Sequence, residues 1–261
     1  MSNIYPILKG LVGAPTEKRF NFIESHLKKL GMDPSVYELD SQRGKDKHIS
    51  VKFDYGSDQE LWLTANYDTF QKLPSANNNA SGVTTLLDLS ERLLQGGDLP
   101  INLRLIFFDA GLDTDLITQR KRNPGFIAGS KYFLDHMLNE EIDFIENYVG
   151  AIILQALGKG NLCTFQKTGK KNENSSELNK LLRLSGDSFG DTVELKGQSP
   201  LTDNISFLRE GLDATVLARY HEGSWHRMQT KKDDLSNINP NVIHSTVDFL
   251  HNLLISYGGK E

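Results

Sequence analysis

The sequence predicts an α/β fold in which a mostly parallel, twisted sheet is flanked by helices on both faces. Strand-like and helix-like segments alternate along most of the chain, which is typical of doubly wound sheets. Residues 101–108 form an almost continuous apolar run, and residues 149–157 are similar, as expected for central strands covered on both faces. The 261 residues suffice for one substantial core, so we expect a single domain over residues 1–261.

The amino-terminal part is predicted to contain helices followed by strands. The segment Ala14-Pro15-Thr16-Glu17 is typical of a helix start, apolar residues then recur at helical spacing, and Gly31 is a suitable stop. Residues 35–39, 48–53 and 61–65 are β-rich. Residues 81–94 carry the apolar stripe of a long helix, which Gly96-Gly97 ends.

The remaining segments complete the alternation. We predict a helix at 126–137 between the two apolar strands, helices at 176–184 and 203–210, a strand at 214–220 and a closing helix at 240–257. In doubly wound sheets the reactive residues gather at the carboxyl ends of the strands. Those ends carry Asn66-Tyr67-Asp68, the segment 109–112, Gln155 and the segment 221–226.

Composition narrows the possible classes of function. The formal net charge of −5 argues against a nucleic-acid binder, because binding phosphates needs a concentrated basic surface. The basic residues 120–122 are interpreted as a solvated loop, and the lone Cys163 as a buried small residue in a reducing compartment. We find neither a signal peptide nor an apolar run of the ~20 residues that would span a bilayer. We therefore expect a cytoplasmic protein without membrane partners.

Six short segments, in order along the chain, resemble the site motifs of one enzyme superfamily. They are Asn66-Tyr67-Asp68 (H-x-D), residues 75–82 (G-A-x-D-x-A-S-G), residues 105–112 (L-I-F-F-D-G-E-E), Gly129-Ser130 (G-S), residues 202–207 (D-D-H-x-P-F) and Trp225-His226 (W-H). The chain thus resembles the zinc-dependent exopeptidases, a superfamily that contains aminopeptidases and animal-type glutaminyl cyclases. Trp225 and the strand that ends in Phe107-Phe108-Asp109 favour the cyclase branch. The resemblance implies the same α/β fold.

The resemblance also shows where this chain departs from its relatives. The metal positions of the superfamily would be occupied here by Asn66, Asn78, Leu112, Gln155 and His226, and the general acid/base glutamate by Gly111. Zinc sites are built from thiolate, imidazole and carboxylate ligands, whereas amides are neutral and leucine offers no lone pair. Of these positions only His226 carries a usual zinc ligand. We therefore expect no bound metal and no cofactor.

A rebuilt metal site is an alternative. His221, Glu222 and His226 resemble the H-E-x-x-H helix motif, but their spacing is one residue too long and Gly223-Ser224 disfavours a helix. Simple crowding of His221 and Glu222 at a loop tip is the other interpretation.

Two functions from different classes follow from the resemblance. In the first, the protein is a pseudoenzyme whose pocket binds a small amine, an amino-acid derivative or a peptide N-terminus. The proposed binding residues are Asn66, Asp68, Asn78, Gln155 and Trp225. In the second, the protein is a metal-independent enzyme that performs cyclisation or acyl transfer on an aminoacyl or glutaminyl substrate, with Asp203 and His226 as proton carriers.

Each of these residues also has a purely structural interpretation. Asp203 precedes a short helix and is suited to be its N-cap, and Asp68 is suited to cap a neighbouring backbone group. His226 is equally compatible with a hydrogen-bonded loop residue, and Trp225 with a core position. A nucleotide-binding role has little support, since the segments 158–160 and 168–171 lack the spacing of a phosphate-binding loop.

Overall fold

The computed structural model describes residues 4–41, 44–69, 73–109, 128–190, 192–222, 227–228 and 230–257. Within these ranges, nine strands form one sheet in the order β1-β2-β4-β3-β5-β9-β6-β7, and β8 pairs with β6. The strands are β1 Ser35–Ser41, β2 Gly44–Phe53, β3 Glu60–Asn66, β4 Asn102–Phe108, β5 Tyr148–Gln155, β6 Asn161–Thr168, β7 Asn172–Glu173, β8 Glu194–Ser199 and β9 Ala214–Tyr220. The helices are α1 Ile4–Leu11, α2 Thr16–Lys29, α3 Ser81–Gln95, α5 Ala128–Glu140, α6 Phe144–Asn147, α7 Ser176–Phe189, α8 Asn204–Arg209 and α9 Pro240–Ile255.

The four central strands confirm the predicted doubly wound sheet. Strands β4, β3, β5 and β9 run parallel to one another. The outer pairs β1–β2, β2–β4, β6–β9 and β6–β7 are antiparallel, and β8 runs parallel to β6. The sheet as a whole is therefore mostly, but not wholly, parallel. Strands β6, β7 and β8 were not predicted, because β7 has only two residues and exposed residues interrupt the apolar pattern of β6 and β8. Strand β8 is also interrupted by Gly197 and so carries little of the alternation that identifies a strand.

Burial on both faces explains why the central strands are so apolar. Every residue of β3 is buried. Leu61 and Leu63 face one hydrophobic cluster, which includes α3 and α9, while Trp62 faces a second cluster with α5 and α8. Successive side chains of a strand point to opposite faces, so a strand between two helical layers must be apolar throughout.

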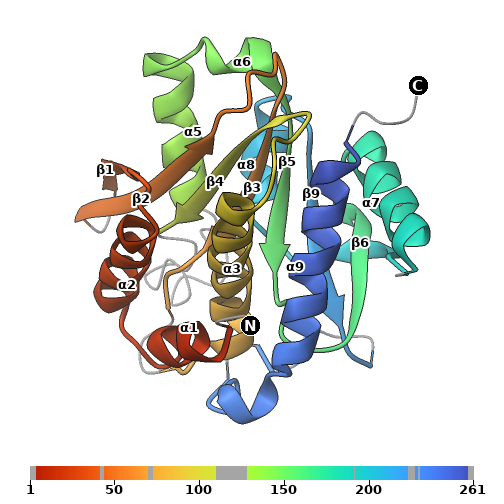
Figure 1. Ribbon diagram of the computed structural model, residues 1–261. Coiled ribbons are helices and arrows are strands. Elements are labelled where there is room, and N and C mark those ends of the chain that lie inside the picture. Colours follow the sequence, from red (N-terminus) through yellow and green to blue (C-terminus); the bar gives the residue numbers. More distant parts are fainter. Residues whose placement is uncertain are drawn as a thin grey trace.

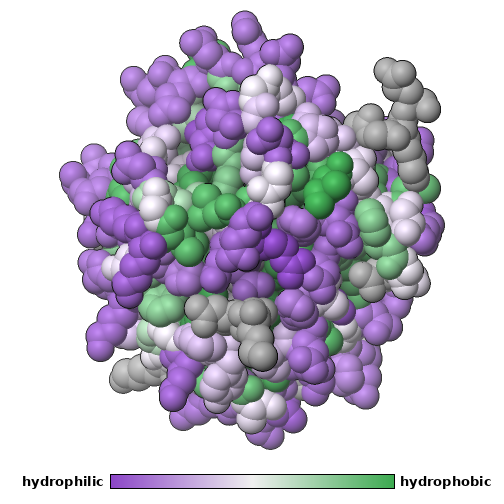
Figure 2. Space-filling view, in the orientation of Figure 1, coloured by the Kyte–Doolittle hydropathy of each residue, from purple (hydrophilic) through white to green (hydrophobic). Residues whose placement is uncertain are grey.

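Two helical layers cover the sheet. Helices α3 and α9 pack against each other in front of the sheet in Figure 1, with α1 and α2 beside α3 and α7 beside α9. Helices α5 and α8 contact each other and cover the opposite face. The face of the molecule seen in Figure 2 is mostly hydrophilic, with smaller apolar patches between the polar groups. Among the described residues, no helix has the length and apolar character needed to cross a bilayer.

The predicted helices are present, with small changes at their ends. Helix α2 begins directly after Pro15 and is stopped by Gly31, whose φ of 82° favours glycine. Helix α5 begins at Ala128 within the described residues, so the predicted start at 126–127 lies outside them. Gly129 lies in its first turn, where a Cβ atom would come within 1.7 Å of the carbonyl oxygen of Asp109. Only glycine fits this close approach between α5 and the end of β4.

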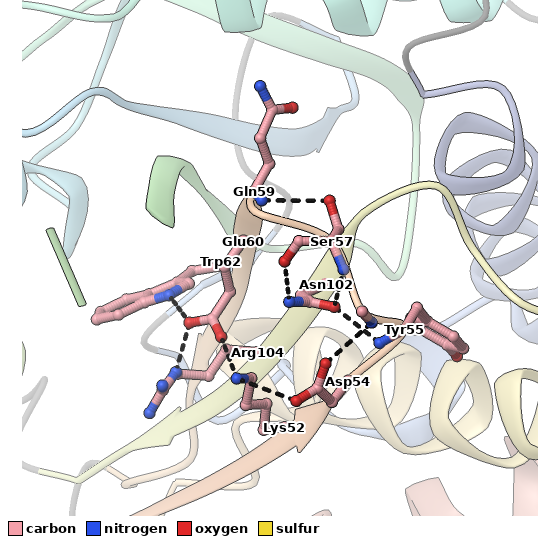
Figure 3. A network of polar contacts seen from close by, with 10 residues as sticks. Lys52, Asp54, Tyr55, Ser57, Gln59, Glu60, Trp62, Asn102 and Arg104 are labelled. Atoms are coloured by element: carbon pink, nitrogen blue, oxygen red, sulfur yellow. Dashed lines mark hydrogen bonds and ion pairs between the residues drawn. The ribbon is translucent and has the colours of Figure 1, made fainter. Parts of the chain in front are cut away.

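A buried carboxylate fixes the amino ends of β3 and β4 (Figure 3). Glu60 Oε1 accepts hydrogen bonds from Trp62 Nε1 at 2.6 Å and from Arg104 Nε at 2.8 Å. The hydrogen bonds of the Glu60 carboxylate are charge-assisted and therefore stronger than neutral ones. In the turn before β3, the side-chain oxygen of Asn102 accepts from the backbone amides of Tyr55 and Ser57 at 2.7 and 3.3 Å. The strand register is therefore held at the edge opposite the candidate site.

Candidate functional site

The candidate site lies where the parallel strands end. Strands β3 and β5 end at Asn66 and Gln155, and β4 ends one residue before Asp109. In Figure 1 the arrow of β5 points down toward this edge. The segment Ala76–Ala80, which leads into α3, lies beside these ends and contributes Asn78. The structure thus brings together three of the residues that the sequence assigned to the site, namely Asn66, Asn78 and Gln155.

Two of these amides form a direct pair. Gln155 Nε2 donates a hydrogen bond to Asn78 Oδ1 at 2.6 Å, and both side chains are buried. The oxygen of Asn78, which is the only atom of its amide able to face a cation, is therefore already engaged by a donor. This hydrogen bond joins two neutral amides, which carry no negative charge that a cation would balance.

Asn79, which was not among the residues predicted from the sequence, connects Asn66 to the end of β5. Its Nδ2 donates to Asn66 Oδ1 at 3.2 Å and to the carbonyl of Leu154 at 2.8 Å. Its Oδ1 accepts from the backbone amide of Ala156 at 3.1 Å. Asn66 Nδ2 in turn donates to Asp68 Oδ1 at 3.0 Å. In the part of the chain that the structure describes, the hydrogen bonds thus link Asn66 to Asn79, which follows Asn78 across a cis peptide bond.

Asp233 holds the loop that carries these asparagines. Its two carboxylate oxygens accept hydrogen bonds from the backbone amides of Asn77 and Asn78 at 2.6 and 3.1 Å. Burial raises the pKa of Asp233 to about 6, and the two amides and the nearby Arg19 oppose that shift. This role could not be predicted from the sequence, because Asp233 lies in the polar run Lys231-Lys232-Asp233-Asp234, which is typical of an exposed loop.

Arg19 on α2 ties the same loop to the rest of the protein. Its guanidinium is fully buried and donates to the carbonyl oxygens of Leu11 at 2.8 Å, Pro74 at 3.1 Å, and Tyr67 and Ser75 at 3.3 Å. Burial lowers the pKa of Arg19 to about 10, which leaves it charged at neutral pH, while Asp68 and Asp233 act in the opposite direction. This residue was also missed, because it occupies a helical position at which arginine is normally exposed.

Asp203 lies buried at the start of α8, with only 3% of its surface exposed. Burial raises its pKa to about 7; a hydrogen bond with Ser130 opposes the shift and the charge of Asp68 adds to it. Its Oδ1 atom has no hydrogen-bond partner among the described residues. Asp203 occupies the N-cap position, but its side chain makes no capping hydrogen bond, so the interpretation of Asp203 as a simple cap is wrong.

The neighbouring Asn204 explains how Asp203 is held in place. Asn204 Nδ2 donates to Thr168 Oγ1 at 2.9 Å and to Asn174 Oδ1 at 2.7 Å, while its Oδ1 accepts from Thr202 at 2.5 Å. This fully buried side chain anchors the first turn of α8 to the end of β6 and to the segment between β7 and α7. The position of the Asp203 carboxyl group is therefore set by a rigid polar network.

Several residues assigned to the site lie outside the described ranges: Gly111, Leu112, Trp225 and His226. The alternative metal site of His221, Glu222 and His226 is described only in part. His221 Nε2 lies 3.7 Å from Glu222 Oε1, and the Glu222 side chain is largely exposed. Among the described residues, no three histidine, cysteine, aspartate or glutamate side chains are grouped as a metal site would require.

The described side chains do not fit a zinc ion. At the three described positions where the resemblance places metal ligands, Asn66, Asn78 and Gln155 offer neutral amides, and the oxygens of Asn66 and Asn78 already accept hydrogen bonds. A dinuclear zinc site needs anionic or imidazole ligands at 2.0–2.3 Å to balance the charge. This donor set instead suits a polar group that exchanges hydrogen bonds.

Comparisons with known proteins agree with this architecture. Residues 49–254 match the family model of peptidase family M28. The fold is similar to that of the Legionella pneumophila LapA aminopeptidase, with a TM-score of 0.77 and 13% identity over 99% of this chain and 72% of that one. It is also similar to a Porphyromonas gingivalis glutaminyl cyclase, with a TM-score of 0.75 and 18% identity over 96% and 94% of the two chains.

A third solved structure shows the same fold. It is a Zn-dependent exopeptidase from Parabacteroides distasonis, with a TM-score of 0.74 and 17% identity over 97% of this chain and 95% of that one. No curated protein shows a significant sequence match to this chain. At these low identities the structural similarity establishes the fold and leaves the chemistry to the residues themselves.

Proposed function

This chain belongs to peptidase family M28, and we propose that it is a zinc-independent member whose site binds the amino group of a small amine, an amino-acid derivative or a peptide N-terminus. The amide pair of Gln155 and Asn78 supports the first part of this proposal, because neutral groups that hydrogen-bond to each other stand where charged metal ligands would be expected. A protein of this kind is a pseudoenzyme with respect to metallopeptidase chemistry, since it has no means of generating a metal-activated water.

The single observation that carries amine binding is the unsatisfied oxygen of Asp203. A buried acceptor without a donor costs free energy, and an ammonium group supplies several donors together with a compensating charge. The charge of Asp68 contributes to the raised pKa of Asp203, so a second carboxylate acts on the same group. A bound cation would stabilise both carboxylates and lower the pKa of Asp203.

A second candidate function is favoured by the pKa of Asp203. A carboxyl group that titrates near 7 is well matched to proton transfer at neutral pH. In a glutaminyl substrate the α-amine would attack the side-chain amide carbon. The ring N–C bond would form, the C–N bond to ammonia would break, and one amine proton would move to the leaving ammonia. Asp203, together with His226, would carry that proton, and holding amine and amide together would supply much of the rate.

Calorimetric titration in the presence of a chelator tests amine binding. We expect a glutaminyl dipeptide to bind the wild-type protein, and its N-acetylated form to bind about tenfold more weakly because it lacks the charged amine. Asp203→Asn should remove this preference, whereas Asp187→Asn, which neutralises an exposed carboxylate on α7, should keep it. Equal binding of both peptides by the wild type would refute the proposal.

Ammonia release from the same dipeptide distinguishes the two candidate functions. Turnover that persists with chelator and is lost in both Asp203→Asn and His226→Ala would establish the enzyme. Binding without turnover would establish the pseudoenzyme.

A further inference from the structure

A groove on the far side of the sheet from α5 carries an excess of positive charge. It has a volume of about 390 Å³ and lies between β6, the segment Glu173–Asn174, α7 and β8. Its charged side chains are those of Lys167, Lys180, Arg183 and Glu173. Three positively charged side chains and one negatively charged side chain line the groove, so its net charge is positive although the formal net charge of the chain is −5.

The cations come from both walls of the groove. Arg183 follows Lys180 by three residues and Asn179 by four, which are the spacings of one helix face, so α7 presents these side chains to the same groove. Lys167 projects from β6 and forms an exposed ion pair with Glu173 at 3.1 Å. Within the described part of the chain, Lys180 and Arg183 form no ion pair. Two neighbouring like charges on one helix face repel each other, and an external anion would relieve that repulsion.

The floor of the groove is rigid. The side-chain amides of Asn174 and Asn179 both donate to the carbonyl of Phe165, at 2.8 and 2.9 Å. Asn179 Oδ1 also accepts from the hydroxyl groups of Thr164 and Thr215, at 2.5 Å each. Because the floor satisfies its own hydrogen bonds, it holds its shape without a ligand. A preformed floor lowers the entropic cost of binding at the charged walls.

We propose that this groove binds a small organic dianion, through Arg183 and Lys180 on one wall and Lys167 on the other. Its volume lies in the range of metabolite sites and is too small for a macromolecular surface. Leu195 and the aliphatic parts of the lysines provide apolar surface for the body of such a ligand. The candidate ligands have two negative charges on oxygen atoms in common, as in a phosphate monoester or a dicarboxylate. Guanidinium groups recognise both in a bidentate manner.

Calorimetric titration with phenyl phosphate and with succinate, at low salt, tests this proposal and distinguishes the two sources of the charge. We expect one of them to bind with a dissociation constant below about 1 mM, and the Lys180→Gln/Arg183→Gln double variant to bind it at least about tenfold more weakly. The matched control is Lys28→Gln/Lys131→Gln, which removes the same charge from exposed positions on α2 and α5. It should bind within about twofold of the wild type.

Amide chemical shifts locate the ligand. The largest changes should fall on α7 and on residues 166–167, and they should weaken as salt is added. An equal loss of affinity in the control variant, shifts centred elsewhere, or no saturation by either anion at about 10 mM would overturn the proposal. Asp203→Asn should leave this binding unchanged, so the result is independent of the proposed amine site.

Discussion

Gln155 and Asn78 hydrogen-bond to each other across the end of β5 and the loop before α3, with 2.6 Å between Gln155 Nε2 and Asn78 Oδ1. Each group is the partner that the other needs, because one amide supplies the donor and the other the acceptor. The two amides stand at positions where the resemblance to zinc exopeptidases would place two metal-binding carboxylates, and they hydrogen-bond to each other instead.

The first prediction concerns metal content. After dialysis against a weak chelator, the wild-type protein should retain far less than one zinc ion per chain, because the amides cannot replace anionic ligands. The triple variant Asn66→His/Asn78→Asp/Gln155→Asp should retain more zinc than the wild type, as measured by elemental analysis. Stoichiometric zinc in the wild type would contradict the coordination argument.

A second prediction tests the amide pair itself. Gln155→Glu places a carboxylate oxygen against Asn78 Oδ1 at neutral pH, so we expect it to destabilise the fold by about 2 kcal/mol. At about pH 4 the glutamic acid can be protonated and donate, and part of the loss should be recovered. Urea denaturation at both pH values measures this. The control Gln166→Glu, at an exposed position of β6, should show little change.

The pH dependence of stability should report on Asp203. Its pKa is raised from 3.8 to about 7 in the folded protein, so the folded state keeps a proton that the unfolded chain releases. The associated stability is present below about pH 4 and is lost as the pH rises through about 7. Asp203→Asn cannot ionise, so its stability relative to the wild type should rise across this window, by at most roughly 4 kcal/mol.

Urea denaturation of both proteins between about pH 4 and pH 7 gives this difference. Because Asp233 also has a raised pKa and is present in both proteins, its contribution cancels in the comparison. Parallel curves for the two proteins would show that Asp203 titrates normally.

A fourth prediction addresses the clamp on the asparagine loop. Asp233→Asn replaces one acceptor by an NH2 group that faces a backbone amide, so we expect a loss of about 1–3 kcal/mol. Hydrogen exchange at the amides of Asn77 and Asn78 should accelerate more than exchange in α9. The adjacent Asp234→Asn serves as the control, since the side chain of Asp234 accepts hydrogen bonds from the backbone amide and the hydroxyl group of the exposed Ser236. Equal effects of the two substitutions would exclude the clamp.

The sequence predicted the central fold because the same physical pattern recurs in it. Strands such as 101–108, buried on both faces, must be apolar throughout, and helices such as 81–94 show one apolar stripe. Strands β6, β7 and β8 lack such a pattern, since exposed residues interrupt β6 and β8 and β7 has only two residues. Hydrophobic periodicity therefore identifies the central strands and the helices better than short or partly exposed strands.

The candidate site was predicted only in part. Motif order along the chain located Asn66, Asn78, Gln155 and Asp203, but it did not reveal Arg19, Asn79 or Asp233. Those three act through backbone groups that are distant in sequence: Arg19 reaches the carbonyl of Ser75, and Asp233 the amides of Asn77 and Asn78. A contact between a side chain and a distant backbone group leaves no residue pattern, so only the three-dimensional arrangement exposes it.

The side chain of Asn79 imitates a peptide unit of an adjacent strand. It gives a donor to the carbonyl of Leu154 and takes one from the amide of Ala156, which is how two strands pair across a ladder. The loop is thus held to the end of β5 by one side chain that takes the place of a neighbouring strand. We consequently expect the end of β5 and the loop to unfold together as one cooperative unit. Loosening either of them would then disrupt the candidate site.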